Sequence, residues 1–162
     1  MAAGFCPTCE APGTVGTPCL ERVCRNTGSH FIPEPQFAKV RGRPPGSRNP
    51  MIGQLVGDYL IVDVVGEGGF GKVYLGLQVP ILLKAALKVM SIEGVDADTA
   101  SMMARKFEGE AQALASLNHP NIVRLLKYGV WHDQPYLVME YVENGQTLKK
   151  EVTDREIGRA HV

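Results

Sequence analysis

The chain has 162 residues, 44% of them hydrophobic, and its 17 basic and 17 acidic residues give a formal net charge of zero. This composition is typical of one globular unit with a small appendage, and the balanced charge argues against a general nucleic-acid or membrane-surface role. No apolar run approaches the roughly 18 residues of a membrane span, and the N-terminus lacks the basic and apolar regions of a signal peptide. We therefore expect a cytoplasmic location.

All four cysteines lie in the first 24 residues, as Cys6-x₂-Cys9 followed by Cys19-x₄-Cys24. In a reducing compartment this clustering indicates metal binding sooner than disulfides. Two thiolate pairs in tight turns are suited to a structural, tetrahedral zinc site, in which His30 is an alternative to one thiol. Four thiolates leave no open position, which argues against a catalytic zinc. The other interpretation is a disordered tail with free thiols.

Residues 1–32, the expected zinc-ribbon-like segment, are followed by a stretch of linker composition at 33–55. Five prolines lie between Pro33 and Pro50, together with basic residues that have no acidic neighbour. This composition predicts a flexible, semi-extended linker. Within it, Arg41-Gly42-Arg43-Pro44 matches the core of an AT-hook, which lays arginines along a narrow minor groove. A solvated linker is the expected interpretation, and a nucleic-acid contact is the alternative.

A glycine-rich stretch follows, from Val65 to Val73, with the pattern G-x-G-x-x-G-x-V beginning at Gly66. The P-loop pattern fails at Val73, where a hydroxyl is needed to hold Mg²⁺. A dinucleotide fingerprint should open a helix, whereas the residues after Val73 favour a strand. The remaining interpretation is a hairpin whose glycines let the backbone approach a triphosphate, with Phe70 covering the site. An ordinary glycine hairpin is the alternative.

Lys88 lies inside an apolar strand expected at 84–90, where an unpaired ammonium is costly, so it needs an anion. A helix is expected from about Asp98 to Leu117, because its apolar residues share one stripe. Glu110 falls on that same stripe and is therefore the expected partner of Lys88. The apolar residues of the stripe are Met103, Phe107, Leu114 and Leu117.

Five strands and this helix make up the expected fold, an α+β unit with a five-stranded antiparallel sheet. Val79-Pro80 should form the turn before the third strand, because proline is disfavoured inside a central strand. The helix should end at His119-Pro120, since proline cannot continue it. The strands are expected at 59–65, 72–77, 84–90, 122–126 and 136–141.

These motifs, in this order and spacing, resemble the N-terminal lobe of a protein kinase, of the bacterial Ser/Thr type related to eukaryotic kinases. The resemblance covers about 56–148. It implies that ATP lies beneath the glycine hairpin, that Lys88 holds its α- and β-phosphates, and that Glu110 orients Lys88. It also implies that Met139 closes the back of the adenine pocket. The other nucleotide-binding residues that it implies are Val65, Gly66, Glu67, Gly68, Gly69, Phe70, Gly71, Val73 and Ala86, with the backbone of Glu140 and Val142 at the adenine edge.

The catalytic motifs of a kinase, H-R-D-x-x-x-x-N, D-F-G and A-P-E, do not occur in these residues. The Mg²⁺ ligands and the protein-substrate site are therefore expected in a C-terminal lobe that is absent here. We interpret 149–162 as a truncated tail and 157–162 as sequencing read-through. The expected function is that of an inactive ATP-binding fragment of a serine/threonine kinase. The alternative is a non-catalytic zinc-ribbon or pseudokinase module that binds a regulator or DNA.

Overall fold

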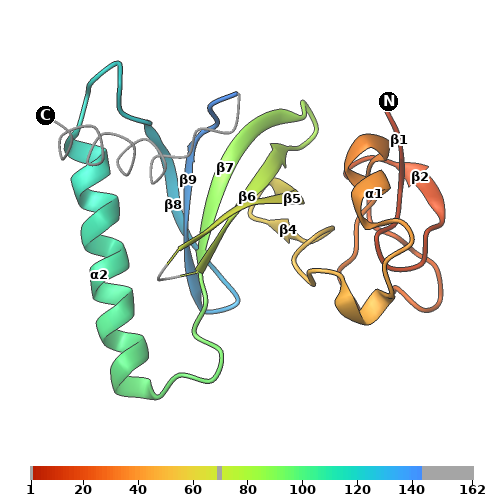
Figure 1. The fold of residues 1–162 in the computed structure, drawn as a ribbon, viewed down its shortest axis with the longest axis horizontal. Helices are drawn as coiled ribbons and strands as arrows, with labels where there is room; N and C mark the ends of the chain where they lie inside the picture. The colour runs from red at the N-terminus through yellow and green to blue at the C-terminus, as the bar shows by residue number, and fades with distance from the viewer. Residues whose placement is uncertain (1, 69–70, 144–162) are drawn as a thin grey trace, which may run out of the picture. The chain divides into compact units, whose positions relative to one another are not determined.

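The computed structural model describes residues 2–68 and 71–143 (Figure 1). The tail expected at 149–162, including 157–162, lies outside the described residues. All four cysteines fall in the first of two compact units. The first unit comprises Met1–Val64 and Tyr74–Ala85, and the second comprises Val65–Val73 and Ala86–Val162.

A small antiparallel sheet forms at the N-terminus. Its strands are β1 (Ala3–Phe5), β2 (Pro12–Thr14) and β3 (Ile32–Pro33), in the order β2-β1-β3. Gly4 is required in the central strand, because a Cβ there would lie 2.4 Å from the carbonyl oxygen of Ile32. The pairing of β1 with β3 brings residue 32 back beside residues 3–5, which closes the cysteine-bearing residues between them into one loop region.

The structure differs from the flexible linker expected at 33–55. Pro35 lies in the first turn of a helix, where the missing N–H costs no helical hydrogen bond. Phe37 and Val40, three residues apart, are 1% and 6% exposed. The number of prolines predicted a flexible segment, but burial of these two side chains stabilises a helix. The elements of this segment are α1 (Glu34–Val40), a 3-10 turn (Pro45–Ser47) and β4 (Leu55–Val56).

The segment that matches an AT-hook is part of this folded region. The guanidinium carbon of Arg41 lies 5.0 Å from the ring centroid of Phe37 and 5.5 Å from that of Phe5. The two rings stack on each other with their centroids 5.0 Å apart. Gly42 has a φ of +83°, so the backbone turns where an AT-hook core is flat and extended. Arg41 therefore serves a cation–π contact within the protein.

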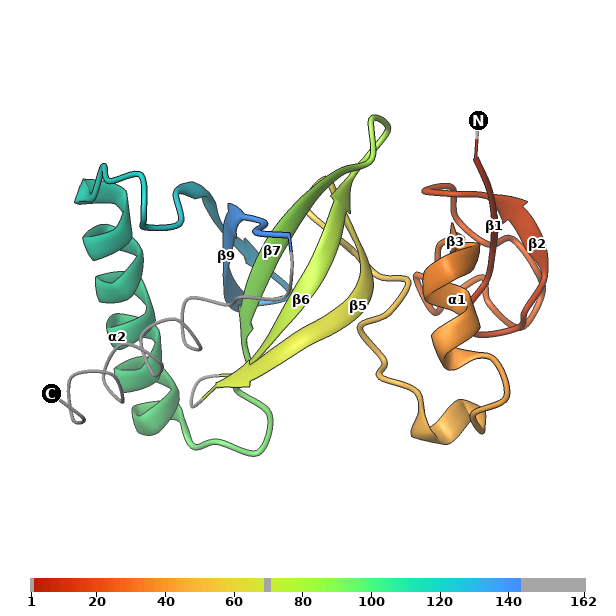
Figure 2. The ribbon, with the colours of Figure 1, turned by 45° about the horizontal axis from the view of Figure 1, so that its top comes forward.

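Within the residues that the structure describes, the main sheet has six strands where five were expected. Figure 2 shows β5 (Tyr59–Gly68), β6 (Gly71–Gln78) and β7 (Leu83–Met90) side by side. The addition is β4, whose Leu55 pairs with Leu60 and whose Val56 pairs with Tyr59. The expected turn at Val79-Pro80 lies between β6 and β7. The remaining strands are β8 (Leu125–Trp131) and β9 (Gln134–Glu140), and the order in the sheet is β4-β5-β6-β7-β9-β8.

Strand β8 begins at Leu125, three residues later than the start expected at Ile122. The residues before it form a turn, in which the backbone N–H of Ile122 donates to the carbonyl of His119. The backbone N–H of Asn121 donates to Nδ1 of the same histidine, at 3.1 Å. His119 therefore organises the turn that follows the helix.

Helix α2 (Ala97–Ser116) is within one residue of the helix expected at 98–117. Asp96 caps its N-terminus, because its Oδ1 accepts a hydrogen bond from the Thr99 N–H at 2.6 Å. Leu117 was expected on the buried stripe, but it is the C-cap residue and 48% exposed. The helix packs on the sheet through a core of Met90, Phe107, Ala111 and Leu137, flanked by Met103, Leu114 and Leu125.

Candidate functional site

The glycine hairpin is formed by the end of β5 and the start of β6. Its expected tip, Gly69 and Phe70, lies outside the described residues. Gly71 has a φ of +141°, and a Cβ on it would lie 2.4 Å from the carbonyl oxygen of Val89 on β7. Only glycine suits both the conformation and this close approach of two backbones. The hairpin backbone therefore packs directly beside the strand that contains Lys88.

The structure brings Lys88 and Glu110 together, as the sequence predicted. Lys88 Nζ donates to Glu110 Oε2 at 2.9 Å, and the two side chains are 19% and 43% exposed. In β7 the period of two places Lys88 on the same face as Met90, which contacts α2. In α2 Glu110 follows the buried Phe107 by three residues and so shares its stripe. The aromatic ring of Phe107 lies beneath the ammonium, with its centroid 5.9 Å from Nζ.

The side chains expected around adenine differ in their exposure to solvent. Val65, Val73 and Ala86 are half-buried, and Met139, near the end of β9, is 9% exposed. Glu140 and Val142 are exposed, and they follow Met139 along the chain. The backbone N–H of Glu140 donates to the carbonyl of Arg124 at 3.0 Å. These residues all belong to the second unit, as do Gly66, Glu67, Gly68, Gly71, Lys88 and Glu110.

The four cysteines converge in the first unit, with every pair of sulfur atoms within 4.8 Å. Cys6 Sγ lies 3.7 Å from Cys24 Sγ, and Cys9 Sγ lies 3.6 Å from Cys19 Sγ. Four sulfurs at zinc–sulfur distances of about 2.3 Å around a tetrahedral ion are about 3.8 Å apart, so the donor set fits such an ion. His30 is not part of this group of donor atoms, and its Nδ1 lies 2.7 Å from the Gly28 carbonyl oxygen.

Ser29, a residue without a role in the sequence analysis, lies beside the sulfur cluster. It is 2% exposed, and its Oγ lies 3.3 Å from Cys6 Sγ and 3.1 Å from Thr8 Oγ1. Burial raises the pKa of the Cys6 thiol, but hydrogen bonds with Ser29 and with the backbone of Cys9 and Thr8 lower that pKa to about 7. The thiolate form that a metal requires is therefore accessible near neutral pH.

The pKa values of the other two buried thiols, Cys19 and Cys24, shift upward instead. Burial raises the pKa of Cys19 and of Cys24, since it disfavours the charged form. Cys19 is 3% exposed and Cys24 is 1% exposed. Deprotonating all four thiols in so small a volume therefore requires a compensating cation, which favours a divalent metal as the occupant.

Arg48 is the second residue that sequence reasoning missed. Its side chain is 9% exposed, and it forms an ion pair with Glu10 beside the first cysteine turn. In the sequence it is one of several basic residues in a proline-rich stretch, so no spacing or periodicity distinguishes it. The composition around Arg48, rich in glycine and proline, predicted a flexible linker and gave no indication of a buried side chain.

The chain matches the protein kinase domain over residues 59–161, which is more than half of its length. The chain belongs to this family. The match begins at the first residue of β5 and includes the glycine hairpin, Lys88 and Glu110. The paired lysine and glutamate therefore lie inside the part of the chain that matches the kinase domain. In this structure that part is a curled antiparallel sheet with a helix packed on it.

Individual relatives agree with the family. The chain is 39% identical over 104 residues to the serine/threonine-protein kinase PrkC of Bacillus subtilis (strain 168). It is 39% identical over 94 residues to the serine/threonine-protein kinase pkn2 of Myxococcus xanthus, and 37% identical over 106 residues to a probable serine/threonine-protein kinase of Clostridium perfringens. These alignments cover 64%, 58% and 65% of this chain, but only 15%, 11% and 15% of the relatives. The chain thus spans a small part of the length of these proteins.

Within the residues that the structure describes, no helix is long and apolar enough to cross a membrane.

Proposed function

We propose that this chain provides the ATP-binding lobe of a protein serine/threonine kinase, which transfers the γ-phosphoryl group of ATP to protein hydroxyls. The observation that supports this most directly is the 2.9 Å ion pair between Lys88 and Glu110, beside the glycine hairpin. An ammonium at this position offsets the charge of the α- and β-phosphates, and the carboxylate fixes its direction. A lysine that only snorkelled to solvent would need no partner on the helix.

The residues around Lys88 supply the remaining parts of a nucleotide site. The backbone of Gly66, Gly68 and Gly71 would face the phosphates, since glycine leaves room for close approach. The adenine ring would lie among Val65, Val73, Ala86 and Met139. Glu140 would contribute its carbonyl to the adenine edge, because its N–H already donates to Arg124. Val142 would contribute its backbone, and Glu67 would lie on the hairpin. Gly69 and Phe70, also expected at this site, lie outside the described residues.

Phosphoryl transfer also needs an aspartate near the substrate hydroxyl and side chains that hold Mg²⁺. The motifs that supply these groups do not occur in the 162 residues. We infer that the transfer belongs to a longer protein, of which these residues position Mg-ATP without completing the reaction. The protein substrate would bind outside this chain, and a cytoplasmic location remains a prediction.

We further propose that Cys6, Cys9, Cys19 and Cys24 hold a structural zinc ion. The convergence of their sulfur atoms within 4.8 Å supports this assignment. Four thiolates complete a tetrahedral site, so the ion would supply folding free energy and no catalysis. Contact with DNA is not favoured, since Arg41 is engaged with Phe5 and Phe37 and since Arg48 is largely buried.

Titration of the full chain with a fluorescent ATP analogue tests the nucleotide site. We expect Lys88→Met to weaken binding by about 10- to 100-fold, the value of one charge-assisted hydrogen bond. Lys106→Met removes the same charge from an exposed position on α2 and should leave the affinity unchanged. If the unsubstituted chain binds no nucleotide, or if both variants bind equally, the ATP-binding proposal is wrong and a non-catalytic interaction module is favoured.

A further inference from the structure

Arg48 makes three hydrogen bonds through its guanidinium, and its side chain is 9% exposed. Its Nε donates to the carbonyl of Arg43 at 3.0 Å, one terminal nitrogen donates to the carbonyl of Pro7 at 2.7 Å, and the other donates to Glu10 Oε1 at 2.7 Å. A buried cation is tolerated only when its donors are satisfied. The planar fork of an arginine is suited to hold several acceptors in fixed positions.

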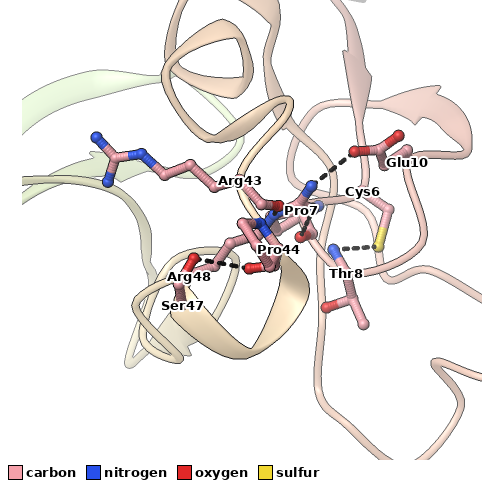
Figure 3. A network of polar contacts seen from close by, with 8 residues as sticks. All are labelled: Cys6, Pro7, Thr8, Glu10, Arg43, Pro44, Ser47 and Arg48. Atoms are coloured by element: carbon pink, nitrogen blue, oxygen red, sulfur yellow. Dashed lines mark hydrogen bonds and ion pairs between the residues drawn. The ribbon is translucent and has the colours of Figure 1, made fainter.

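Two of the three acceptors belong to the first cysteine turn (Figure 3). Pro7 directly follows Cys6, and Glu10 directly follows Cys9. The turn is closed by the Glu10 N–H, which donates to the Cys6 carbonyl at 2.9 Å, and Glu10 has a φ of +66°. The Thr8 N–H points at Cys6 Sγ, at 3.4 Å. Arg48 therefore holds both ends of the turn that presents the first thiol pair.

The segment that contains Arg48 is itself fixed to the rest of the first unit. The Gly53 N–H donates to the carbonyl of Ile61 on β5 at 2.8 Å, and the Ile61 N–H donates back to Gln54 at 2.9 Å. Lys39, on α1, forms an ion pair with Asp63, also on β5. The cysteine turn is thus hydrogen-bonded to a segment that itself pairs with β5, the first strand of the kinase domain, and not to a flexible linker.

A metal-loaded site depends on the groups that hold its ligands in place. Four thiolates and one divalent cation carry a formal charge of about −2, which burial penalises. The ion pair of Arg48 with Glu10 is neutral as a whole, so Arg48 acts on the site by holding the turn. Groups that position metal ligands commonly change metal affinity by about 10- to 100-fold. Ser29, which follows Cys6 by 23 residues, supplies a further polar contact, with its Oγ 3.3 Å from Cys6 Sγ.

We propose that Arg48 is a positioning residue of the four-cysteine metal site: its hydrogen bonds fix the turn that carries Cys6 and Cys9. The consequence is that metal binding and folding of segment 34–56 stabilise each other. This inference rests on the proposed zinc site and is independent of the proposed nucleotide site.

The test uses the full chain and two metals, Zn²⁺ in competition with a chromophoric chelator and Co²⁺ for its thiolate charge-transfer absorption. We expect Arg48→Met to lower Zn²⁺ affinity by about 10- to 100-fold, to change the Co²⁺ spectrum and to reduce the rise in Tm on metal addition. Arg43→Met is the matched control, because only the backbone carbonyl of Arg43 accepts from Arg48 and its side chain extends away from the turn (Figure 3). It should retain the affinity and the spectrum.

Two further variants keep the test decisive where Arg48→Met fails to fold. Arg48→Lys keeps the positive charge but cannot donate to several acceptors at once. Glu10→Gln keeps the hydrogen bond from Arg48 to the Pro7 carbonyl but weakens the one to residue 10. Both variants should lose Zn²⁺ affinity, but less than Arg48→Met does. Equal Zn²⁺ affinity in all variants overturns the role of Arg48 while the zinc site stands. Absence of binding by the unsubstituted chain overturns both, and the ATP-analogue titration is unaffected by either result.

Discussion

Lys88 on β7 and Glu110 on α2 lie 22 residues apart in the chain, and their charged atoms meet at 2.9 Å above the ring of Phe107. The strand fixes one partner and the helix fixes the other, so the distance between them depends on how α2 packs on the sheet. That packing depends on Phe107 and Ala111, which are 0% and 5% exposed. The direction of the ammonium is therefore set by the hydrophobic core of the second unit.

The first prediction concerns the charge of Glu110. Glu110→Gln keeps the shape of the side chain and removes its charge, so Lys88 should lose its fixed direction. Because the carboxylate is 43% exposed, we expect unfolding free energy to change by less than about 1 kcal/mol. ATP-analogue affinity should fall several-fold. Glu108→Gln, at an exposed position on the same helix, is the control. Thermal melts and nucleotide titrations of both variants measure the two effects, and an equal response of the two variants would contradict the pairing.

The second prediction concerns Gly71. Gly71→Ala places a Cβ 2.4 Å from the Val89 carbonyl, at a φ of +141° that side chains rarely adopt. The strain should lower the free energy of unfolding by about 1–3 kcal/mol. Urea denaturation measures this loss, with Gly46→Ala as the comparison, because nothing lies within 4 Å of a Cβ there. A Gly71→Ala protein as stable as the unsubstituted chain would show that the two backbones are not in contact.

The third prediction is a gain in stability. Gly109 lies inside α2, beside Glu110, and a Cβ on it would meet nothing within 4 Å. Gly109→Ala should therefore raise the free energy of unfolding by about 1 kcal/mol, because alanine loses less backbone entropy in a helix. An upward shift of the urea midpoint checks the sign. If the same variant also weakened ATP-analogue binding, Gly109 would be needed for a motion of the helix and not for its packing.

The sequence predicted the parts of the fold that depend on local periodicity. The helix bounds were correct within one residue, and Lys88 and Glu110 were paired, because a period of two and a period of 3.6 place each on a buried face. It failed where distant partners decide the structure. Helix α1 is stabilised by stacking of Phe37 on Phe5, 32 positions earlier, and no local pattern shows that contact.

The same limit applies to the edges of the elements and to Arg48. Strand β4 has only two residues and exists because Leu55 and Val56 pair with β5, which composition does not reveal. Leu117 continued the helical stripe in sequence, but α2 ends one residue before it. Arg48 was indistinguishable from other basic residues, since its partners Pro7 and Glu10 are about 40 positions away.

The fourth prediction is a pH dependence at the start of α2. The side-chain and backbone hydrogen bonds of Thr99 hold the pKa of Asp96 below its ordinary value. A lowered folded-state pKa stabilises the fold above the unfolded-state pKa, and this contribution is lost as the pH falls through the folded-state pKa. Asp96→Asn keeps the cap without a titrating group. The Tm difference between the two proteins should therefore shrink below about pH 4, the ordinary range of an aspartate.

Asp98→Asn is the control for this pH experiment, because it removes the same charge from the first turn without removing the cap. Its pH profile should follow that of the unsubstituted chain in the acid range more closely than that of Asp96→Asn does. Identical acid profiles for Asp96→Asn and the unsubstituted chain would mean that the hydrogen bond to Thr99 does not persist in solution.

The last prediction concerns removal of the proposed zinc ion from the four-cysteine site. Burial opposes ionisation of Cys19 and Cys24, so without a cation these thiols should be protonated and the close approach of the four sulfurs should no longer be favoured. A chelator should therefore lower the Tm of the first unit and increase hydrogen exchange at the amides of β1 and β3, and of Gly53 and Ile61, which link them to β5. Added Zn²⁺ should reverse both effects in the unsubstituted chain.

Cys24→Ser distinguishes this linkage from a general effect of the chelator. With one thiolate removed, the variant should exchange rapidly at the same amides before any chelator is added, and Zn²⁺ should restore little protection. The amides of α2, in the second unit, provide the internal reference in the same spectra. A shared folding unit must lose protection at both amides when its metal is removed. If protection at Gly53 and Ile61 does not change with Zn²⁺, with chelator or with Cys24→Ser, the cysteine loop and β5 fold independently.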